Sequence, residues 1–148
     1  MAEALALARE AAEAGEVPVG CVIVKDGRVV GEGRNRRETG RTALGHAEIE
    51  ATHQACRTLG GWRPTGYTLY VTLEPCPMCA GAIVNARIPA LYYGARDDKA
   101  GCCGSVLNLF EERFNHHPRL YRGPLEGECQ EILQRFFQGL REDGEENV

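Results

Sequence analysis

The chain has 148 residues, 43% of them hydrophobic and 26% charged, and these proportions are typical of one soluble globular domain. Its formal net charge of −4 provides no general attraction for polyanions, so any nucleic-acid contact requires a local cluster of basic residues. No apolar run approaches the roughly 18 residues of a membrane span, and Glu3 and Arg9 interrupt the alanine-rich start, unlike a signal peptide. We therefore expect a cytoplasmic protein with no membrane partner.

The first half of the chain carries the patterns of a helix, a β-hairpin and a second helix. The predicted elements are a helix over 2–14, strands over 17–24 and 28–33 around a Lys-Asp-Gly turn, and a helix over 46–59. Between the hairpin and the second helix lies the arginine-rich stretch RNRRETGR, residues 34–41. Such a stretch is more often a solvated surface, but its position directly before His46 favours a contact with phosphate.

The second half of the chain alternates strands with helices. The predicted elements are a strand over 68–74, a helix over 77–86, a strand over 90–96, a short helix near 105–110, a strand over 119–123 and a helix over 125–140. This alternation predicts a layered α/β domain in which some strands pair in parallel. We expect residues 1–141 to form the domain and the acidic segment 142–148 to be a disordered tail.

The chain contains seven cysteines, an odd number that favours metal ligands or free thiols over a disulfide framework. Cys76 and Cys79 stand three apart in EPCPMC, at the start of a predicted helix whose first residue is Pro77. The unpaired N–H groups and the positive dipole end of a helix favour thiolates there, and thiolates bind zinc. A redox pair and a chance spacing are the alternatives. Cys102 and Cys103 are expected to be ordinary loop residues.

His46 is the candidate for a third ligand. It follows Gly45 at the start of a predicted helix and precedes Glu48 by two positions. Positions two apart on a helix point in different directions, so both side chains reach one site only if His46 is the cap residue. A zinc with three protein ligands retains an open position and can make water a nucleophile at neutral pH. Glu48 would then transfer protons, which suits hydrolytic deamination of an aromatic amine.

The pattern H-x-E followed by P-C-x-x-C is the signature of zinc deaminases, and here it reads HAE and PCPMC. Together with AGEVPVGCVIV, TLYVTLEPCPMCAGAIVNARI, YGARDDKAGCCGS and FNHHP, it makes the chain resemble the cytidine-deaminase superfamily. Within that superfamily the chain looks like the bacterial tRNA-specific adenosine deaminases, over residues 4–140. The resemblance implies a three-layer α/β/α fold with a five-stranded mixed sheet flanked by helices, and a homodimer.

The resemblance also implies an activity: zinc-dependent hydrolysis of adenosine to inosine at the wobble position of an arginine tRNA. It assigns His46, Cys76 and Cys79 to one zinc ion and Glu48 to catalysis. The substrate-binding residues that it implies, in contact with the nucleoside or the tRNA anticodon loop, are Pro18, Asn35, Ala47, Asp97, Asn115 and His116. For Asp97, a purely local role in the loop after the strand over 90–96 is the competing interpretation.

Two other functions share parts of the pattern. A deaminase of a free base or nucleoside, such as guanine, cytosine or cytidine, would use the same zinc chemistry and fits the acidic balance of charge. A zinc-stabilised binding module would explain the three ligands but not Glu48, a carboxylate placed beside the metal. Asn35, the arginine-rich stretch and FNHHP favour an RNA substrate.

Overall fold

Five strands form one sheet in the order β2-β1-β3-β4-β5 in the computed structural model, which describes residues 1–63 and 65–146. The strands are β1 (Gly20–Lys25), β2 (Arg28–Arg34), β3 (Thr68–Leu73), β4 (Ala90–Ala95) and β5 (Arg119–Arg122). β1 pairs antiparallel with β2 and with β3, whereas β4 pairs parallel with β3 and with β5. The sheet is therefore mixed, as predicted.

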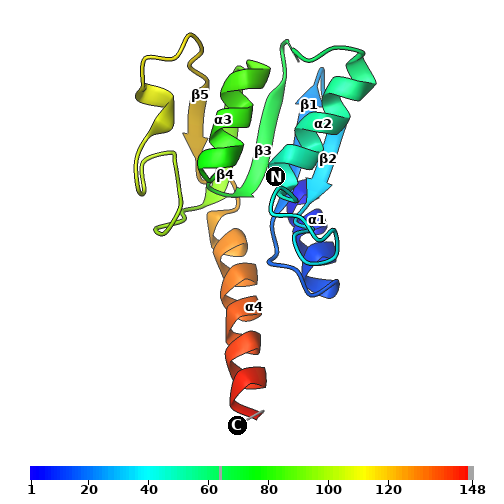
Figure 1. Ribbon diagram of the computed structural model, residues 1–148, viewed down its shortest axis with the longest axis vertical. Helices are drawn as coiled ribbons and strands as arrows, with labels where there is room; N and C mark the ends of the chain where they lie inside the picture. Colours follow the sequence, from blue (N-terminus) through cyan, green and yellow to red (C-terminus); the bar gives the residue numbers. More distant parts are fainter. Residues whose placement is uncertain (64, 147–148) are drawn as a thin grey trace.

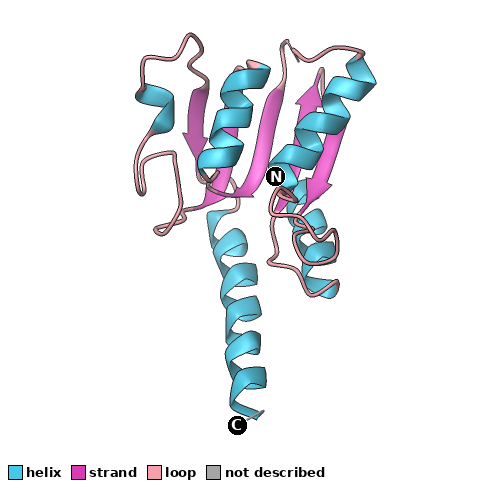
Figure 2. Ribbon diagram, viewed as in Figure 1, coloured by secondary structure: helices cyan, strands magenta, loops and turns pink. Residues whose placement is uncertain are grey.

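Helices cover both faces of this sheet (Figures 1 and 2). Those in the described part of the chain are α1 (Ala2–Glu13), α2 (Ala47–Leu59), α3 (Pro77–Ala86), α4 (Glu126–Glu146) and the short 3₁₀ helix η1 (Leu109–Glu111). Gly20 lies against α1, whereas Gly33, on the neighbouring row of the sheet, lies against α2. Adjacent rows point to opposite faces, so α1 and α2 belong to different layers. The three-layer α/β/α prediction is confirmed, and no helix of the described residues is long and apolar enough to cross a membrane.

Two glycines allow α2 to pack closely on β2. A Cβ atom on Gly31 would lie 2.3 Å from the carbonyl oxygen of Ala51, and one on Gly33 would lie 2.3 Å from that of Ala47. Both positions therefore require glycine, because any side chain would collide with the helix backbone. The contact with Ala47 involves the first residue of α2, so it determines where this helix begins relative to the sheet.

We expect Gly33→Ala to destabilise the protein by about 1–3 kcal/mol, since the added methyl group overpacks the interface between α2 and β2. The free energy of unfolding, measured with urea, tests this expectation. Gly81→Ala is the matched control, because Gly81 lies within α3 and a Cβ atom there would meet nothing within 4 Å. The control should be neutral or stabilising by up to about 1 kcal/mol. Equal effects of the two substitutions would contradict the close-packing explanation.

The loop between β4 and η1 differs from the prediction. A short helix was expected near 105–110, but η1 comprises only Leu109–Glu111. Ser105 instead donates through its backbone N–H and its hydroxyl to the carboxylate of Glu74. Asn108 accepts a hydrogen bond from the N–H of Phe110 and so caps η1. Because side chains use these backbone groups, a longer helix does not form.

The C-terminal helix is longer than predicted. α4 continues through Glu146, so residues 142–146 are helical where a disordered tail was expected, and 147–148 lie outside the described residues. The segment has no proline, and three of its five residues, 142, 145 and 146, are glutamate, a good helix former. Gln138 donates to Glu142 one turn later, which supports the continuation. In Figure 1 this last part of α4 extends well beyond the sheet.

Candidate functional site

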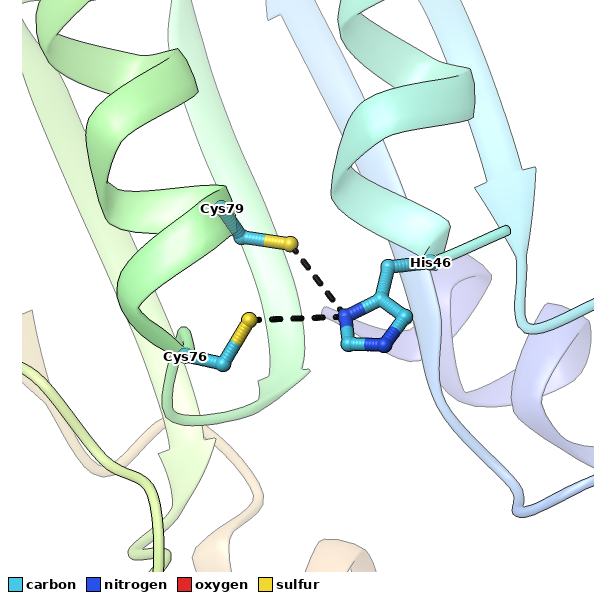
Figure 3. A group of neighbouring side chains, drawn as sticks. All are labelled: His46, Cys76 and Cys79. Carbon is cyan, nitrogen blue, oxygen red and sulfur yellow. Dashed lines mark hydrogen bonds between the residues drawn. The ribbon is translucent and has the colours of Figure 1, made fainter. Parts of the chain in front are cut away.

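The starts of α2 and α3 bring three side chains together from two distant segments (Figure 3). His46 is the cap residue of α2 and Cys76 that of α3, each with extended backbone angles, and Pro77 opens α3. The Nδ1 atom of His46 lies 3.5 Å from the Sγ of Cys76 and 3.4 Å from the Sγ of Cys79. The three ligand atoms all lie within 4.8 Å of one another. The cap position predicted for His46 is thus observed.

These three residues fit a zinc ion. Bonds of about 2.0–2.3 Å in a tetrahedron place nitrogen and sulfur ligands about 3.5 Å apart, close to the separations found here. Within the described residues, this is the one cluster of three histidine, cysteine or acidic side chains able to hold a metal. Cys102 and Cys103 are not part of it; both are buried in the hydrophobic core. Three ligands leave a tetrahedral ion one open position.

Cys76 is the thiol of the cluster that loses its proton most readily. The Cys79 thiol donates a hydrogen bond that lowers the pKa of Cys76 to about 4, and the His46 ring acts in the same direction. Burial opposes this shift but does not cancel it. The hydrogen bond to Cys76 raises the pKa of Cys79, as does burial, and the same thiolate raises the pKa of His46. Protons thus link the three groups, and a divalent cation would take the place of those protons.

Glu48 is a buried carboxyl in the first turn of α2, only 4% exposed. Burial raises its pKa to about 7, although its own backbone N–H and the side chain of Cys79 act in the opposite direction. It is not a member of the three-ligand cluster. A carboxyl group with such a pKa can both accept and release a proton near neutral pH, which is the property that general acid–base catalysis requires.

A cavity of about 710 Å³ opens onto this cluster. Its walls include Val17 and Val19 before β1, Asn35 and Arg37 after β2, His46 and Glu48 of α2, Glu74 and Cys76 after β3, residues 96–100 after β4, and Leu133, Gln134 and Phe137 of α4. The volume is typical of sites that bind small molecules. His46, Glu48 and Cys76 therefore stand at the wall of one cavity, whereas Cys79 is fully buried and is not part of the wall.

Of the six predicted substrate-binding residues, two line the cavity and four do not. Asn35 donates to the carbonyl of Val17 and accepts from the N–H of Arg37, so its amide is firmly oriented. Asp97 lies on the rim, where its Oδ1 accepts from the N–H groups of two later loop residues. Pro18 and Ala47 are buried and are not part of the wall; the valines on either side of Pro18 form it instead.

Asn115 and His116 lie far from the cavity. The Nε2 of His116 donates to the carbonyl of Ile88, 2.7 Å away, just before the start of β4. The cavity is at the opposite end of the sheet, where β3 and β4 finish, and Figure 1 shows the yellow loop before β5 at the far end. Within one chain, therefore, these two residues do not reach the nucleoside-sized cavity, because β5 runs parallel to β4 and must be entered from that far end.

The arginines of the 34–41 stretch have different surroundings. Arg34 donates to the carbonyl of Glu10 at the end of α1, and Arg36 forms an ion pair with Glu50 at 3.0 Å. Arg37 is the one that lines the cavity. Only part of the predicted basic cluster is thus available to a ligand in the cavity.

Sequence reasoning missed Glu74 and the α4 residues. Glu74 is a buried carboxylate directly before the Pro-Cys pair, in a position where a strand ends against the site. Burial acts to raise its pKa, but hydrogen bonds from Ser105, Cys103 and Asp97 outweigh that effect and lower it. The signal available in the sequence was an acidic residue placed between an apolar strand and a metal-ligand motif. For α4, the apolar stripe indicated only a packed helix.

Comparison with known proteins agrees with this geometry. The model of the MafB19-like deaminase family matches residues 1–141. A tRNA-specific adenosine deaminase of Bacillus subtilis is 49% identical over 142 residues, covering 95% of this chain and 88% of that protein. A solved structure from a study of A-to-I editing by tRNA deaminases at the wobble position has a TM-score of 0.85 and 48% identity, covering 88% of this chain and 95% of that one. A guanine deaminase structure from Bacillus subtilis has a TM-score of 0.63 and 34% identity, with 95% and 90% covered.

Proposed function

The chain belongs to the MafB19-like deaminase family and, with its relatives, to the tRNA-specific adenosine deaminases, and we propose that it hydrolyses adenosine to inosine at the wobble position of a tRNA. The observation that carries this proposal is the cavity in which Glu48 stands beside the His46, Cys76 and Cys79 cluster. Hydrolytic replacement of an amine by water requires a group that transfers protons beside a zinc site, and Glu48 next to the three candidate ligands meets that requirement.

His46, Cys76 and Cys79 would hold one zinc ion, which, when bound, supplies a Lewis acid that makes water nucleophilic at neutral pH. Glu48 accepts a proton from the attacking water as its oxygen bonds to C6 of adenine. It passes that proton to N1 of the ring. The carboxylate then takes the proton of the hydroxyl group on C6 and delivers it to the exocyclic nitrogen, so that the C–N bond breaks, ammonia leaves and C6 becomes a carbonyl carbon next to N1–H. A pKa of about 7 allows one carboxyl group to perform both transfers.

Other parts of the cavity would orient the nucleotide. One N–H of the Asn35 amide is bonded to Val17, and the second would donate to the ribose or base. Val17 and Val19 offer apolar surface to the ring. The base must leave the stack of the anticodon loop to enter such a cavity, which suits an unpaired nucleotide. An arginine tRNA as substrate, a homodimer and a cytoplasmic location stay predictions that follow from the family resemblance.

A free base is the second candidate substrate, because a guanine deaminase structure is 34% identical to this chain. One assay separates the two. Purified protein is incubated with unmodified tRNA, and inosine is quantified after digestion to nucleosides; in parallel, ammonia release is followed with guanine, cytosine and cytidine. The proposal expects inosine at the wobble position and no turnover of the free compounds. Ammonia from guanine without inosine in tRNA would overturn it.

Arg37 is expected to contact an RNA phosphate. We expect Arg37→Ala to weaken tRNA binding and to reduce the slope of log affinity against log salt by about 0.7, the value for one contact on a single strand. Binding measured by fluorescence anisotropy at several salt concentrations gives this slope. Arg36→Ala is the matched control, since Arg36 is already paired with Glu50 outside the cavity. An unchanged slope for Arg37→Ala would contradict the contact.

A further inference from the structure

Glu74 connects the metal-binding segment to the loop that forms one rim of the cavity, here called the rim loop, residues 96–105. Glu74 directly precedes Pro75 and Cys76, and it is only 2% exposed. Its backbone N–H donates to the carbonyl of Ala95 at the end of β4. The loop that follows Ala95 contributes residues 96–100 to the cavity wall, including Asp97 and Lys99.

The carboxylate of Glu74 accepts hydrogen bonds from both ends of the rim loop. Oε1 accepts from the N–H of Asp97 at 3.2 Å and from the hydroxyl of Ser105. Oε2 accepts from the N–H of Cys103 at 2.8 Å and from that of Ser105 at 3.2 Å. No cation forms a salt bridge with Glu74 among the described residues, so these donors alone compensate a buried negative charge.

The rim loop also approaches Glu74 more closely than a side chain would permit. A Cβ atom on Gly101 would lie 2.4 Å from the carboxylate of Glu74. The N–H of Cys102 donates to the carbonyl of Pro75 at 2.9 Å, so the loop is tied to the metal-binding segment at Pro75 as well as at Glu74. The loop is thus wrapped around one carboxylate.

We propose that Glu74 is a positioning residue for tRNA: by holding both ends of the rim loop, it places Asp97 and Lys99 at a defined distance from His46 and Glu48. The proposal rests on the proposed function for its substrate, and it extends that function by a residue that does not touch the reacting atoms. Both oxygens of Glu74 already accept from the loop, so Glu74 is not a second proton-transfer group. Its effect reaches the substrate through the loop.

Glu74→Gln tests this role with a side chain of the same size. The amide nitrogen cannot accept a hydrogen bond, whereas the Ser105 hydroxyl can rotate and become an acceptor. The amide nitrogen should therefore occupy the Oε1 position, and the bond that is lost is the one from the N–H of Asp97. We expect hydrogen exchange at the Asp97 amide, followed by NMR on the zinc-loaded protein, to be about tenfold faster, with Cys103 still protected.

The kinetic consequence should be in substrate binding. We expect the KM for tRNA to rise about tenfold in Glu74→Gln, with kcat within about twofold of wild type. Ser105→Ala, which removes one of the four hydrogen bonds, should raise KM by about two- to threefold. Glu131→Gln is the control, because Glu131 is an exposed helix residue whose one ion pair among the described residues is with Arg135, and it should leave KM unchanged.

The outcomes separate the alternatives. A lower melting temperature with unchanged KM and unchanged exchange at Asp97, measured well below the melting temperature, would overturn the proposal and leave Glu74 a stabilising residue only. If Glu74→Gln does not fold, Ser105→Ala decides by the same two measurements. If the wild-type protein makes no inosine in tRNA, the proposed function fails, but the exchange measurement still shows whether Glu74 holds the rim loop.

Discussion

Glu48→Gln should reduce kcat for tRNA deamination by about 10²–10⁴, the range typical of a lost general acid–base group. Glutamine preserves the volume of this buried side chain but can neither accept a proton from the attacking water nor deliver a proton to the departing amine. The fold should be retained, because burial already disfavours the charged form of Glu48 and the substitution removes that charge. Single-turnover measurements with tRNA, which separate chemistry from binding, provide the rate.

The control for this prediction lies two residues further along α2. Glu50 is also an acidic residue of the first turn, but it pairs with Arg36 and does not line the cavity. Glu50→Gln therefore matches the loss of charge at the helix start without changing the catalytic group, and its rate should stay close to that of wild type. The zinc content of both variants should equal that of the wild-type protein. Turnover by Glu48→Gln at a near wild-type rate would show that another group transfers the protons.

Loss of a metal ligand should have an even larger effect. We expect Cys76→Ala to contain less than about a tenth of the zinc of the wild-type protein and to have no measurable deaminase activity. Cys76 provides the thiolate around which the cluster is arranged, and its pKa of about 4 means that it binds a cation without first losing a proton at neutral pH. Elemental analysis after gel filtration gives the zinc content, and the inosine assay gives the activity.

Cys56→Ser is the matched control for the cysteine substitution. The thiol of Cys56 donates to the carbonyl of Trp62, a bond that a serine hydroxyl can replace, and Cys56 is outside the cluster. This variant should retain zinc and activity. Removing zinc from the wild-type protein with a chelator should lower its melting temperature, since the ion binds the folded chain and not the unfolded one. Freshly purified wild-type protein without bound metal would contradict the zinc assignment.

The local pattern of the sequence was enough to predict most elements and the core of the site. Helix starts and ends depend on nearby residues, so Pro77 and the cap positions of His46 and Cys76 could be recognised in short segments. The clustering of His46, Cys76 and Cys79 could be predicted because the chemistry of zinc allows few combinations of side chains. With Glu48 two positions from His46, the resemblance to zinc deaminases then indicated the reaction.

The tertiary structure alone decided which loops share the cavity and how they are held there. The parallel pairing of β5 with β4 sends the segment that carries Asn115 and His116 to the far end of the sheet, away from the residues with which the resemblance had grouped them. Glu74 lies 23 positions from Asp97 and 31 from Ser105. Hydrogen bonds over such separations leave no periodic trace in a sequence, because they depend on how strands and helices pack. The local chemistry of the site can therefore be predicted from residues that are neighbours in the sequence. The walls of the cavity form only when the sheet brings distant loops together.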